Sequence, residues 1–247
     1  MKSRLCTLGL TALLGTGTTA TAQPTVLVDF GNDSSYRGAS VPAGPDANGN
    51  HWNSVWSGAY YADMVDTGGN ATTIDLGFSD APGTDSYNGP AGPTDVVQDP
   101  SLSDYDAGAL GNLGVDEAVF DYYVSSTFEI QGLDASKTYD LTFYGSFKFG
   151  NDAVTRYAVY SDNTYSTLVA SADLEIFDAA SPWLHNRDTT ATISGVSPQE
   201  FDILYVKFFG AGGGSGILNA MSITEVPTPA SALLLGLGGL VSARRRR

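Results

Sequence analysis

Two loop-rich stretches of the chain combine aromatic rings with planar polar side chains. The candidate residues are Trp52, Trp56, Tyr60, Trp183, Asn186 and Arg187. Such rings stack on the apolar faces of sugar rings, while amide and guanidinium groups hydrogen-bond to sugar hydroxyls. Both stretches are therefore candidate ligand-binding sites for a carbohydrate. The alternative interpretation is that the tryptophans cap one end of a hydrophobic core.

Aspartates crowd the long segment over residues 79–116. Three of them, Asp99, Asp104 and Asp106, are candidate metal ligands, and calcium is the metal that their hard oxygen atoms suit. The spacing does not match an EF-hand, because no glycine stands at the sixth position after Asp99. A solvated acidic loop is the alternative interpretation.

Catalysis has little support in the sequence. Ser34 and His185 could join an aspartate in a hydrolytic triad, but Ser34 lacks the Gly-x-Ser-x-Gly context. The chain has two histidines and a single cysteine, Cys6, which excludes a three-histidine zinc site. Paired carboxylates for glycoside hydrolysis can always be found among 27 acidic residues, so their presence decides nothing.

The elements that must position these residues are strands, separated by loops rich in Gly, Pro, Asp and Asn. Apolar Ile74, Leu76 and Phe78 alternate with Asp75 and Gly77, which predicts a half-buried strand. Similar patterns predict strands over 26–30, 72–78, 119–130, 139–149, 156–160, 173–177, 189–193, 203–209 and 217–223. We therefore expect an all-β fold, an antiparallel β-sandwich with long loops, with no internal repeat.

Residues 1–22 have the pattern of a secretory signal peptide. Lys2 and Arg4 precede an apolar stretch over 5–14, and the small residues at 20 and 22 fit the cleavage rule. Cleavage after residue 22 would also remove Cys6, leaving a domain without disulfides.

The C-terminal segment, residues 226–247, has the organisation of a sorting signal. A proline-bracketed turn precedes an apolar run over 230–243 that predicts a short hydrophobic helix, and four arginines follow. The signal residues are Pro227, Thr228, Pro229, Arg244, Arg245, Arg246 and Arg247. This segment resembles the PEP-CTERM signal of exported bacterial proteins, although Thr228 stands where the family motif has Glu.

That resemblance implies a partner and a location. The partner is an exosortase-type membrane peptidase. The implied location is the cell surface or extracellular matrix of a Gram-negative-type bacterium, after transient anchoring in the inner membrane.

The domain between the two terminal segments, residues 23–225, is strongly acidic. Of the 12 basic residues, two precede residue 23 and four follow residue 225, while all 27 acidic residues lie between. Six basic against 27 acidic residues give this domain a net charge of −21. Such a surface repels nucleic acid, whose phosphates need a basic footprint.

The domain also resembles a family of β-sandwich modules. The segments that carry the resemblance span residues 28–31, 46–53, 132–144 and 216–223. The last of them resembles the final strand of galactose-binding-like and malectin-like jelly rolls, which implies a jelly-roll fold and glycan binding.

Together these observations predict an exported, non-catalytic protein that binds an extracellular glycan. A structural or adhesive envelope protein without a specific ligand is the first alternative. A secreted hydrolase is the second.

Overall fold

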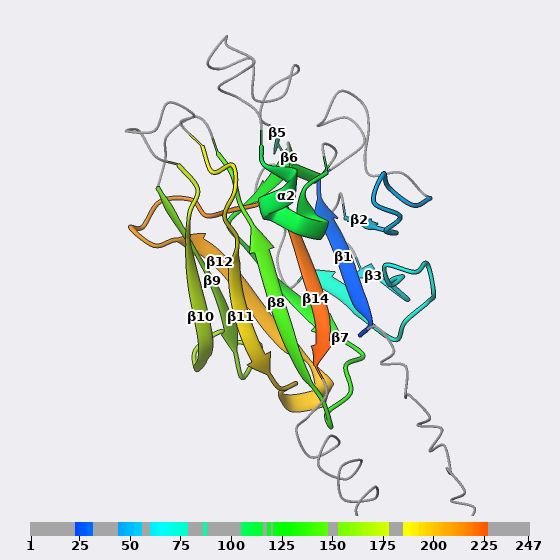
Figure 1. Ribbon diagram of the computed structural model, residues 1–247. Helices are drawn as coiled ribbons and strands as arrows, with labels where there is room; N and C mark the ends of the chain where they lie inside the picture. The colour runs from blue at the N-terminus through cyan, green and yellow to red at the C-terminus, as the bar shows by residue number, and fades with distance from the viewer. Residues whose placement is uncertain are drawn as a thin grey trace, which may run out of the picture.

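The computed structural model describes residues 23–31, 44–55, 60–78, 86–87, 105–115, 118–119, 121–147, 153–177 and 185–226. Two β-sheets stacked face to face form the body of this part of the chain (Figure 1). The five-stranded sheet has the order β11 (Ala191–Val196), β8 (Thr138–Tyr144), β14 (Ala220–Val226), β1 (Thr25–Phe30) and β2 (Asn53–Val55).

The second sheet has six strands. Their order is β10 (Leu168–Glu175), β9 (Val154–Tyr160), β12 (Leu204–Gly210), β7 (Ser126–Gln131), β4 (Asp75–Phe78) and β3 (Tyr60–Tyr61). A small third sheet joins β13 (Ile217–Leu218), β6 (Asp121–Val124) and β5 (Ser86–Tyr87). Paired strands in the described ranges are antiparallel except β1 with β2, which confirms the predicted all-β, antiparallel sandwich.

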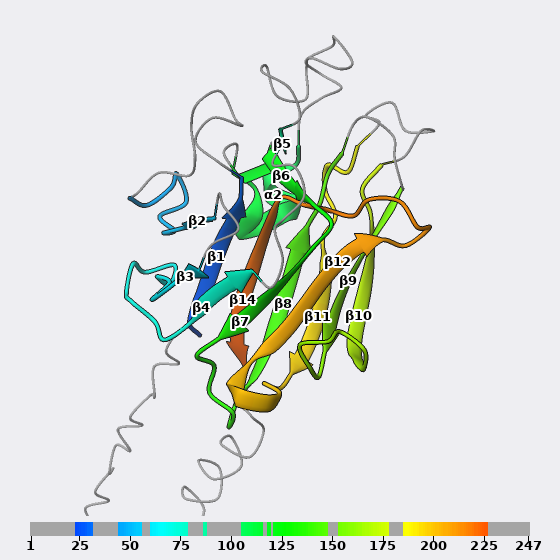
Figure 2. The ribbon, with the colours of Figure 1, turned by 180° about the vertical axis from the view of Figure 1, so that it is seen from behind.

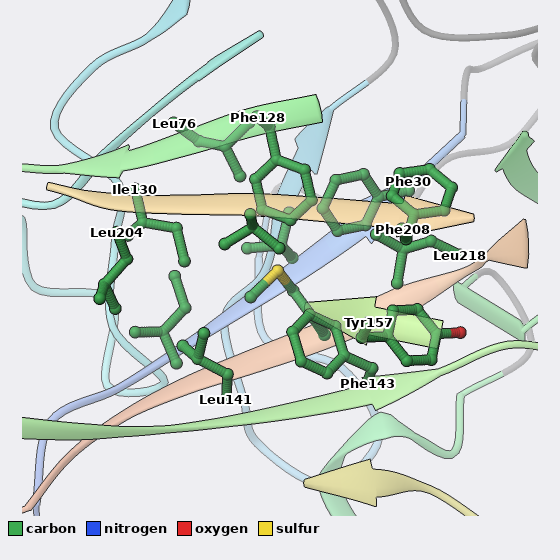
Figure 3. Packing of buried hydrophobic residues seen from close by; sticks show 14 of the residues in the cluster. Phe30, Leu76, Phe128, Ile130, Leu141, Phe143, Tyr157, Leu204, Phe208 and Leu218 are labelled. Carbon is green, nitrogen blue, oxygen red and sulfur yellow. The ribbon is translucent and has the colours of Figure 1, made fainter. Parts of the chain in front are cut away.

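The main core lies between the two large sheets and follows from the period of two along each strand. Val26 and Val28 of β1 point inward from one sheet, and Phe128 and Ile130 of β7 point inward from the other. Aromatic side chains fill the centre (Figure 3). Phe143 and Tyr157 meet there from opposite sheets as a stacked pair with ring centroids 4.5 Å apart.

A smaller core covers one end of the outer face of the five-stranded sheet. Helix α2 (Ala107–Leu110) and the 3-10 turn η2 (Gly111–Leu113) lie over that face, as Figure 1 shows. They pack Leu110 and Leu113 against Leu27 of β1 and Trp52. This explains why Leu27, which points away from the main core, is nevertheless fully buried.

The buried side chain of Asn219 joins several elements at this end. Its Oδ1 accepts a hydrogen bond from the backbone N–H of Ser146 at 2.8 Å, and its Nδ2 donates to the carbonyl of Val119 at 2.9 Å. Its backbone carbonyl accepts from the N–H of Phe30, and its own N–H donates to the carbonyl of Tyr144. Asn219 therefore ties β1, β8 and the covering segment to the point between β13 and β14.

Several predicted strand boundaries are wrong. The stretch predicted over 119–130 divides at Ser125, whose φ of 30° breaks the ladder between β6 and β7. The stretch predicted over 217–223 divides at Asn219 into β13 and β14. Strand β10 begins five residues before its predicted start at residue 173, and the short strands β2, β3 and β5 were not predicted.

The two ends of the described domain lie side by side. Thr25 of β1 pairs with Thr224 of β14, and the N–H of Glu225 donates to the carbonyl of Pro24. The expected signal peptide over 1–22 and the sorting signal with Pro227, Thr228, Pro229, Arg244, Arg245, Arg246 and Arg247 lie outside the described residues.

Candidate functional site

The outer face of the six-stranded sheet carries a row of aromatic and polar residues. Figure 2 shows this sheet from its outer side. The strand register places Tyr60, Gly77, Glu129, Tyr205 and Tyr160 next to one another, in that order, across β3, β4, β7, β12 and β9. Because side chains alternate along each strand, these residues share the face opposite to the core. The row contains three tyrosines brought together from distant parts of the sequence.

Tyr60 is the most exposed tyrosine of this row. Its hydroxyl donates to the Asp75 carboxylate, and this hydrogen bond is the main reason that the pKa of Tyr60 is raised. Its ring lies over Gly77, where an added Cβ would sit 3.3 Å from the ring carbon Cδ2. The side chain is thus held at two points while 56% of its surface stays exposed. We call Tyr60, Asp75 and Gly77 the Tyr60 platform.

Polar side chains surround the Tyr60 platform. Asp75 also accepts from the backbone N–H of Asp63 through Oδ1 at 2.8 Å, which fixes the carboxylate. Gln131 donates to Glu129 at 2.6 Å, and its amide nitrogen lies 3.8 Å from the position of a Cβ on Gly77. An exposed ring bordered by carboxylates and an amide has the chemistry of a sugar subsite.

A second aromatic group, the tyrosine cluster, occupies the same face. It consists of Tyr160, Tyr165 and Tyr205, with Tyr165 in edge-on contact with Tyr160 at 5.7 Å and with Tyr205 at 6.3 Å between ring centroids. Tyr205 is only 5% exposed, and burial is the main reason that its pKa is raised. Tyr165 and Tyr160 are half-buried and present their remaining surface to solvent.

Asp162 shapes the turn that carries Tyr165. Its carboxylate accepts from the backbone N–H of Thr164 at 2.9 Å and from the hydroxyls of Thr164 and Ser166. These hydrogen bonds, led by the Thr164 hydroxyl, lower the pKa of Asp162 to about 2. The carboxylate is therefore ionised at any physiological pH. The turn holds Tyr165 at a φ of 53°, in the left-handed region.

Charged groups continue along the face beyond the tyrosine cluster. Arg156 forms a two-point ion pair with Asp173, with both N–O distances 2.7 Å. Lys207 lies over the ring of Phe209, 5.5 Å from its centroid. Both cations are thus already engaged by neighbouring side chains.

The structure describes four of the six ligand-binding residues predicted from the sequence, and it places Tyr60 apart from the other three. Tyr60 is exposed on the sheet face described above. Trp52 is 6% exposed, and its indole N–H donates to Asp46 at 2.9 Å, so it fits the core-capping interpretation and not the expected stacking surface. Trp56 and Trp183 lie outside the described residues.

The other two predicted residues, Asn186 and Arg187, lie in the loop before β11. Asn186 is buried and organises its loop, donating to the carbonyls of Gly145 and Thr189 and accepting from the Thr189 N–H and hydroxyl. Arg187 is half-buried and its carbonyl accepts from the backbone N–H of Asp106. The expected sugar-binding role of Asn186 does not fit this placement, because its amide is already used inside the fold.

Of the three predicted calcium ligands, the structure describes Asp106 alone. Asp106 is the N-cap of α2 and accepts from the N–H of Ala109 at 3.0 Å, while Asp99 and Asp104 lie outside those ranges. No group of three or more His, Cys, Asp or Glu side chains that could hold a metal occurs among the described residues.

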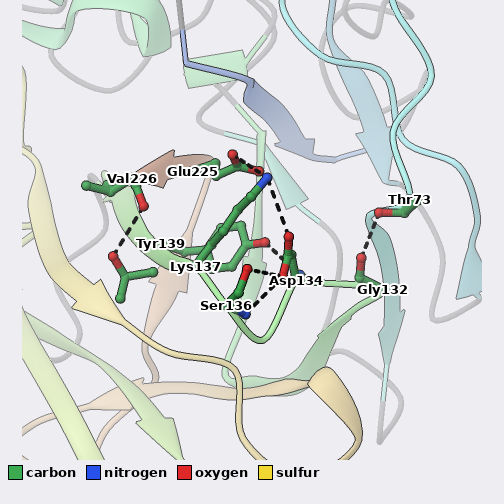
Figure 4. Close-up of polar contacts among 9 residues, drawn as sticks. Thr73, Gly132, Asp134, Ser136, Lys137, Tyr139, Glu225 and Val226 are labelled. Carbon is green, nitrogen blue, oxygen red and sulfur yellow. Dashed lines mark hydrogen bonds and ion pairs between the residues drawn. The ribbon is translucent and has the colours of Figure 1, made fainter. Parts of the chain in front are cut away.

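A cleft of about 480 Å³, lined by both apolar and charged residues, lies at the end of the sandwich where β1 begins and β14 ends. Lys137 on its wall is paired with Glu225 at 2.6 Å and with Asp134 at 3.6 Å (Figure 4). Asp134 also accepts from the N–H and hydroxyl of Ser136, and its N–H donates to the hydroxyl of Tyr139. These contacts stabilise the β7–β8 turn and attach it to β14, so we assign the charged groups a structural role.

The ionised groups of this turn predict how stability depends on pH. Hydrogen bonds from Ser136 lower the pKa of Asp134, so its contribution is complete above its ordinary pKa of 3.8 and is lost as the pH falls through the lower folded value. Glu225 raises the pKa of Lys137, whose contribution is lost only as the pH rises beyond its ordinary 10.5. We expect the urea midpoint to fall in acid, and to fall less steeply in Asp134→Asn. If the urea midpoints of the wild type and of Asp134→Asn fell equally with decreasing pH, the structural role of the Asp134 carboxylate would be contradicted.

The sequence patterns missed the tyrosine cluster. Tyr205, Lys207 and Phe209 alternate with the buried Val206 and Phe208, so an outward aromatic stripe on β12 could have been predicted. That Tyr160 and Tyr165 join it depends on the pairing of β12 with β9, which no local pattern reveals.

No family model, curated protein or solved structure matches this chain. Within the described ranges, no helix has the length and apolar character needed to span a bilayer.

Proposed function

We propose that this protein is an exported, non-catalytic carbohydrate-binding protein whose ligand lies on the outer face of the six-stranded sheet. The observation that carries the proposal is the Tyr60 platform. A half-exposed ring, held by Asp75 and resting over Gly77, is bordered by Glu129 and Gln131. Such a ring stacks on a sugar without first losing side-chain freedom, and the polar groups fix the orientation of the hydroxyls.

The wider proposal concerns fold type and location. The face-to-face antiparallel sheets support a jelly-roll module of the galactose-binding-like or malectin-like kind. Residues 1–22 would direct export, and residues 226–247 would be processed by an exosortase-type peptidase after transient anchoring in the inner membrane. The mature protein would then reside at the cell surface or in the extracellular matrix.

The test is binding of the purified protein to a glycan array, followed by calorimetric titration with the best ligand. We expect Tyr60→Ala to weaken binding roughly tenfold or more, equivalent to about 1.4 kcal/mol, because the stacking surface is removed. Tyr60→Phe keeps the ring and loses only the hydrogen bond to Asp75, so it should retain most of the affinity.

A matched control is Phe201→Ala. Phe201 lies on the 3-10 turn η3 (Glu200–Asp202) between β11 and β12 and is 77% exposed, so its loss removes an exposed aromatic residue outside the Tyr60 platform. If Tyr60→Ala and Phe201→Ala weakened glycan binding equally, the assignment of the site to the Tyr60 platform would be contradicted. If the wild-type protein bound no glycan on the array, the alternative of a structural or adhesive envelope protein would be favoured.

A further inference from the structure

The two aromatic groups on the outer face are too far apart to serve one sugar ring. Tyr60 and Tyr205 lie three strands apart in the same row, and Tyr160 lies one strand further. At the usual strand spacing these separations are about 14 and 19 Å. A ligand that contacts both the Tyr60 platform and the tyrosine cluster must therefore be a chain of several sugars, running across the strands.

The Asp162 turn fixes the backbone that carries the Tyr165 ring. A left-handed conformation is sterically unfavourable in a residue other than glycine, because Cβ crowds the following carbonyl oxygen. Here it is held by the Asp162 turn and places the ring against Tyr160 and Tyr205. The ring of Tyr165 is therefore held in position before a ligand binds, which reduces the side-chain entropy lost on stacking.

The charges along the row restrict the chemistry of the sugar chain that can bind there. Asp75 and Glu129 border the Tyr60 platform, and Asp162 lies at the tyrosine cluster. The carboxylates of Glu129, Glu200 and Asp162 add to burial in raising the pKa of Tyr205, so they act on the same patch. Among the described residues of this face, Arg156 is paired with Asp173, whereas Lys207 lies over Phe209 and keeps its charge. The carboxylates of Asp75, Glu129 and Asp162 therefore outnumber the single unpaired cation. Carboxylates accept hydrogen bonds from sugar hydroxyls but repel sugar carboxylates and sulfates.

We propose that the ligand is a neutral linear polysaccharide that spans the sheet from the Tyr60 platform to a second subsite at Tyr165. This inference rests on the proposed function and adds the direction, length and charge of the ligand. Tyr165 belongs to the second subsite and not to the Tyr60 platform, so its substitution tests whether the ligand occupies both.

The experiment uses an array of neutral, uronate and sulfated oligosaccharides in matched lengths from disaccharide to hexasaccharide. For the wild-type protein we expect binding to neutral chains only, with affinity rising with length. Tyr165→Asn keeps the turn, because asparagine tolerates the left-handed conformation. It should weaken hexasaccharide binding roughly three- to tenfold and leave disaccharide binding unchanged.

The outcomes separate this inference from the proposed function. Tyr60-dependent binding without length dependence, wild-type affinity of Tyr165→Asn for the hexasaccharide, or stronger binding of acidic chains would each overturn the inference alone. Absence of binding to every glycan would overturn both. A thermal melt of Tyr165→Asn that matches the wild type excludes unfolding as the cause of lost binding.

Discussion

Replacing Asn219 with alanine is expected to lower the free energy of unfolding by about 2–5 kcal/mol, because it strands two buried groups. The N–H of Ser146 would lose its acceptor and the carbonyl of Val119 would lose its donor. A buried backbone group left without a hydrogen-bond partner costs about 1–3 kcal/mol. This cost exceeds the net contribution of the complete hydrogen bond, so removing one partner has the larger effect. Urea denaturation followed by fluorescence would measure the loss.

The control for this variant is Asn112→Ala. Asn112 is exposed in η2, and within the described part of the chain its side chain accepts a long hydrogen bond, 3.4 Å, from Asn50. Its replacement should change the unfolding free energy by no more than about 0.5 kcal/mol. If the two alanine variants were equally stable, Asn219 would not be the tie between sheets and covering segment that we infer.

Gly132→Ala is the second substitution with a large expected effect. Gly132 has a φ of 68°, and an added Cβ would sit 1.8 Å from the carbonyl oxygen of Thr73. The variant must therefore accept left-handed strain of about 1–2 kcal/mol and also displace the loop before β4. We expect a total loss of about 3 kcal/mol or more in unfolding free energy, measured by the same urea denaturation.

Gly195→Ala separates the two causes. Gly195 has nearly the same φ, 66°, but nothing lies within 4 Å of the position that an added Cβ would take. This variant should lose only the strain, about 1–2 kcal/mol. Equal losses in the two alanine variants would show that the contact with Thr73 relaxes without cost.

Local alternation was a sound guide to the sandwich. The stretches around Val28, Leu76, Leu141 and Val206 were predicted as strands and form β1, β4, β8 and β12. Errors arose where the chain breaks a ladder for reasons outside the local pattern. Asn219 interrupts a continuous apolar run because its side chain is needed between elements distant in sequence.

The candidate site was predictable only in part. Tyr60 could be chosen as an exposed aromatic residue, but its partners Asp75 and Gly77 follow from the pairing of β3 with β4. Trp52 has the same residue type and loop context as a sugar-stacking tryptophan. Its burial comes from α2 and η2, which lie in a segment expected to be a loop. Non-local packing thus decided the role of each aromatic residue.

The side-by-side ends of β1 and β14 determine how the domain responds to mechanical force. Pulling Thr25 and Val226 apart would unzip the β1–β14 ladder one pair at a time, beginning at Thr25 and Thr224. Pulling Val226 along β14 against a ligand held on the opposite sheet would instead load the ladders with β1 and β8 in shear, all pairs at once. Because shear loads all pairs of a ladder at once, the domain should resist more force along the line from its last strand to the proposed glycan than between its two ends.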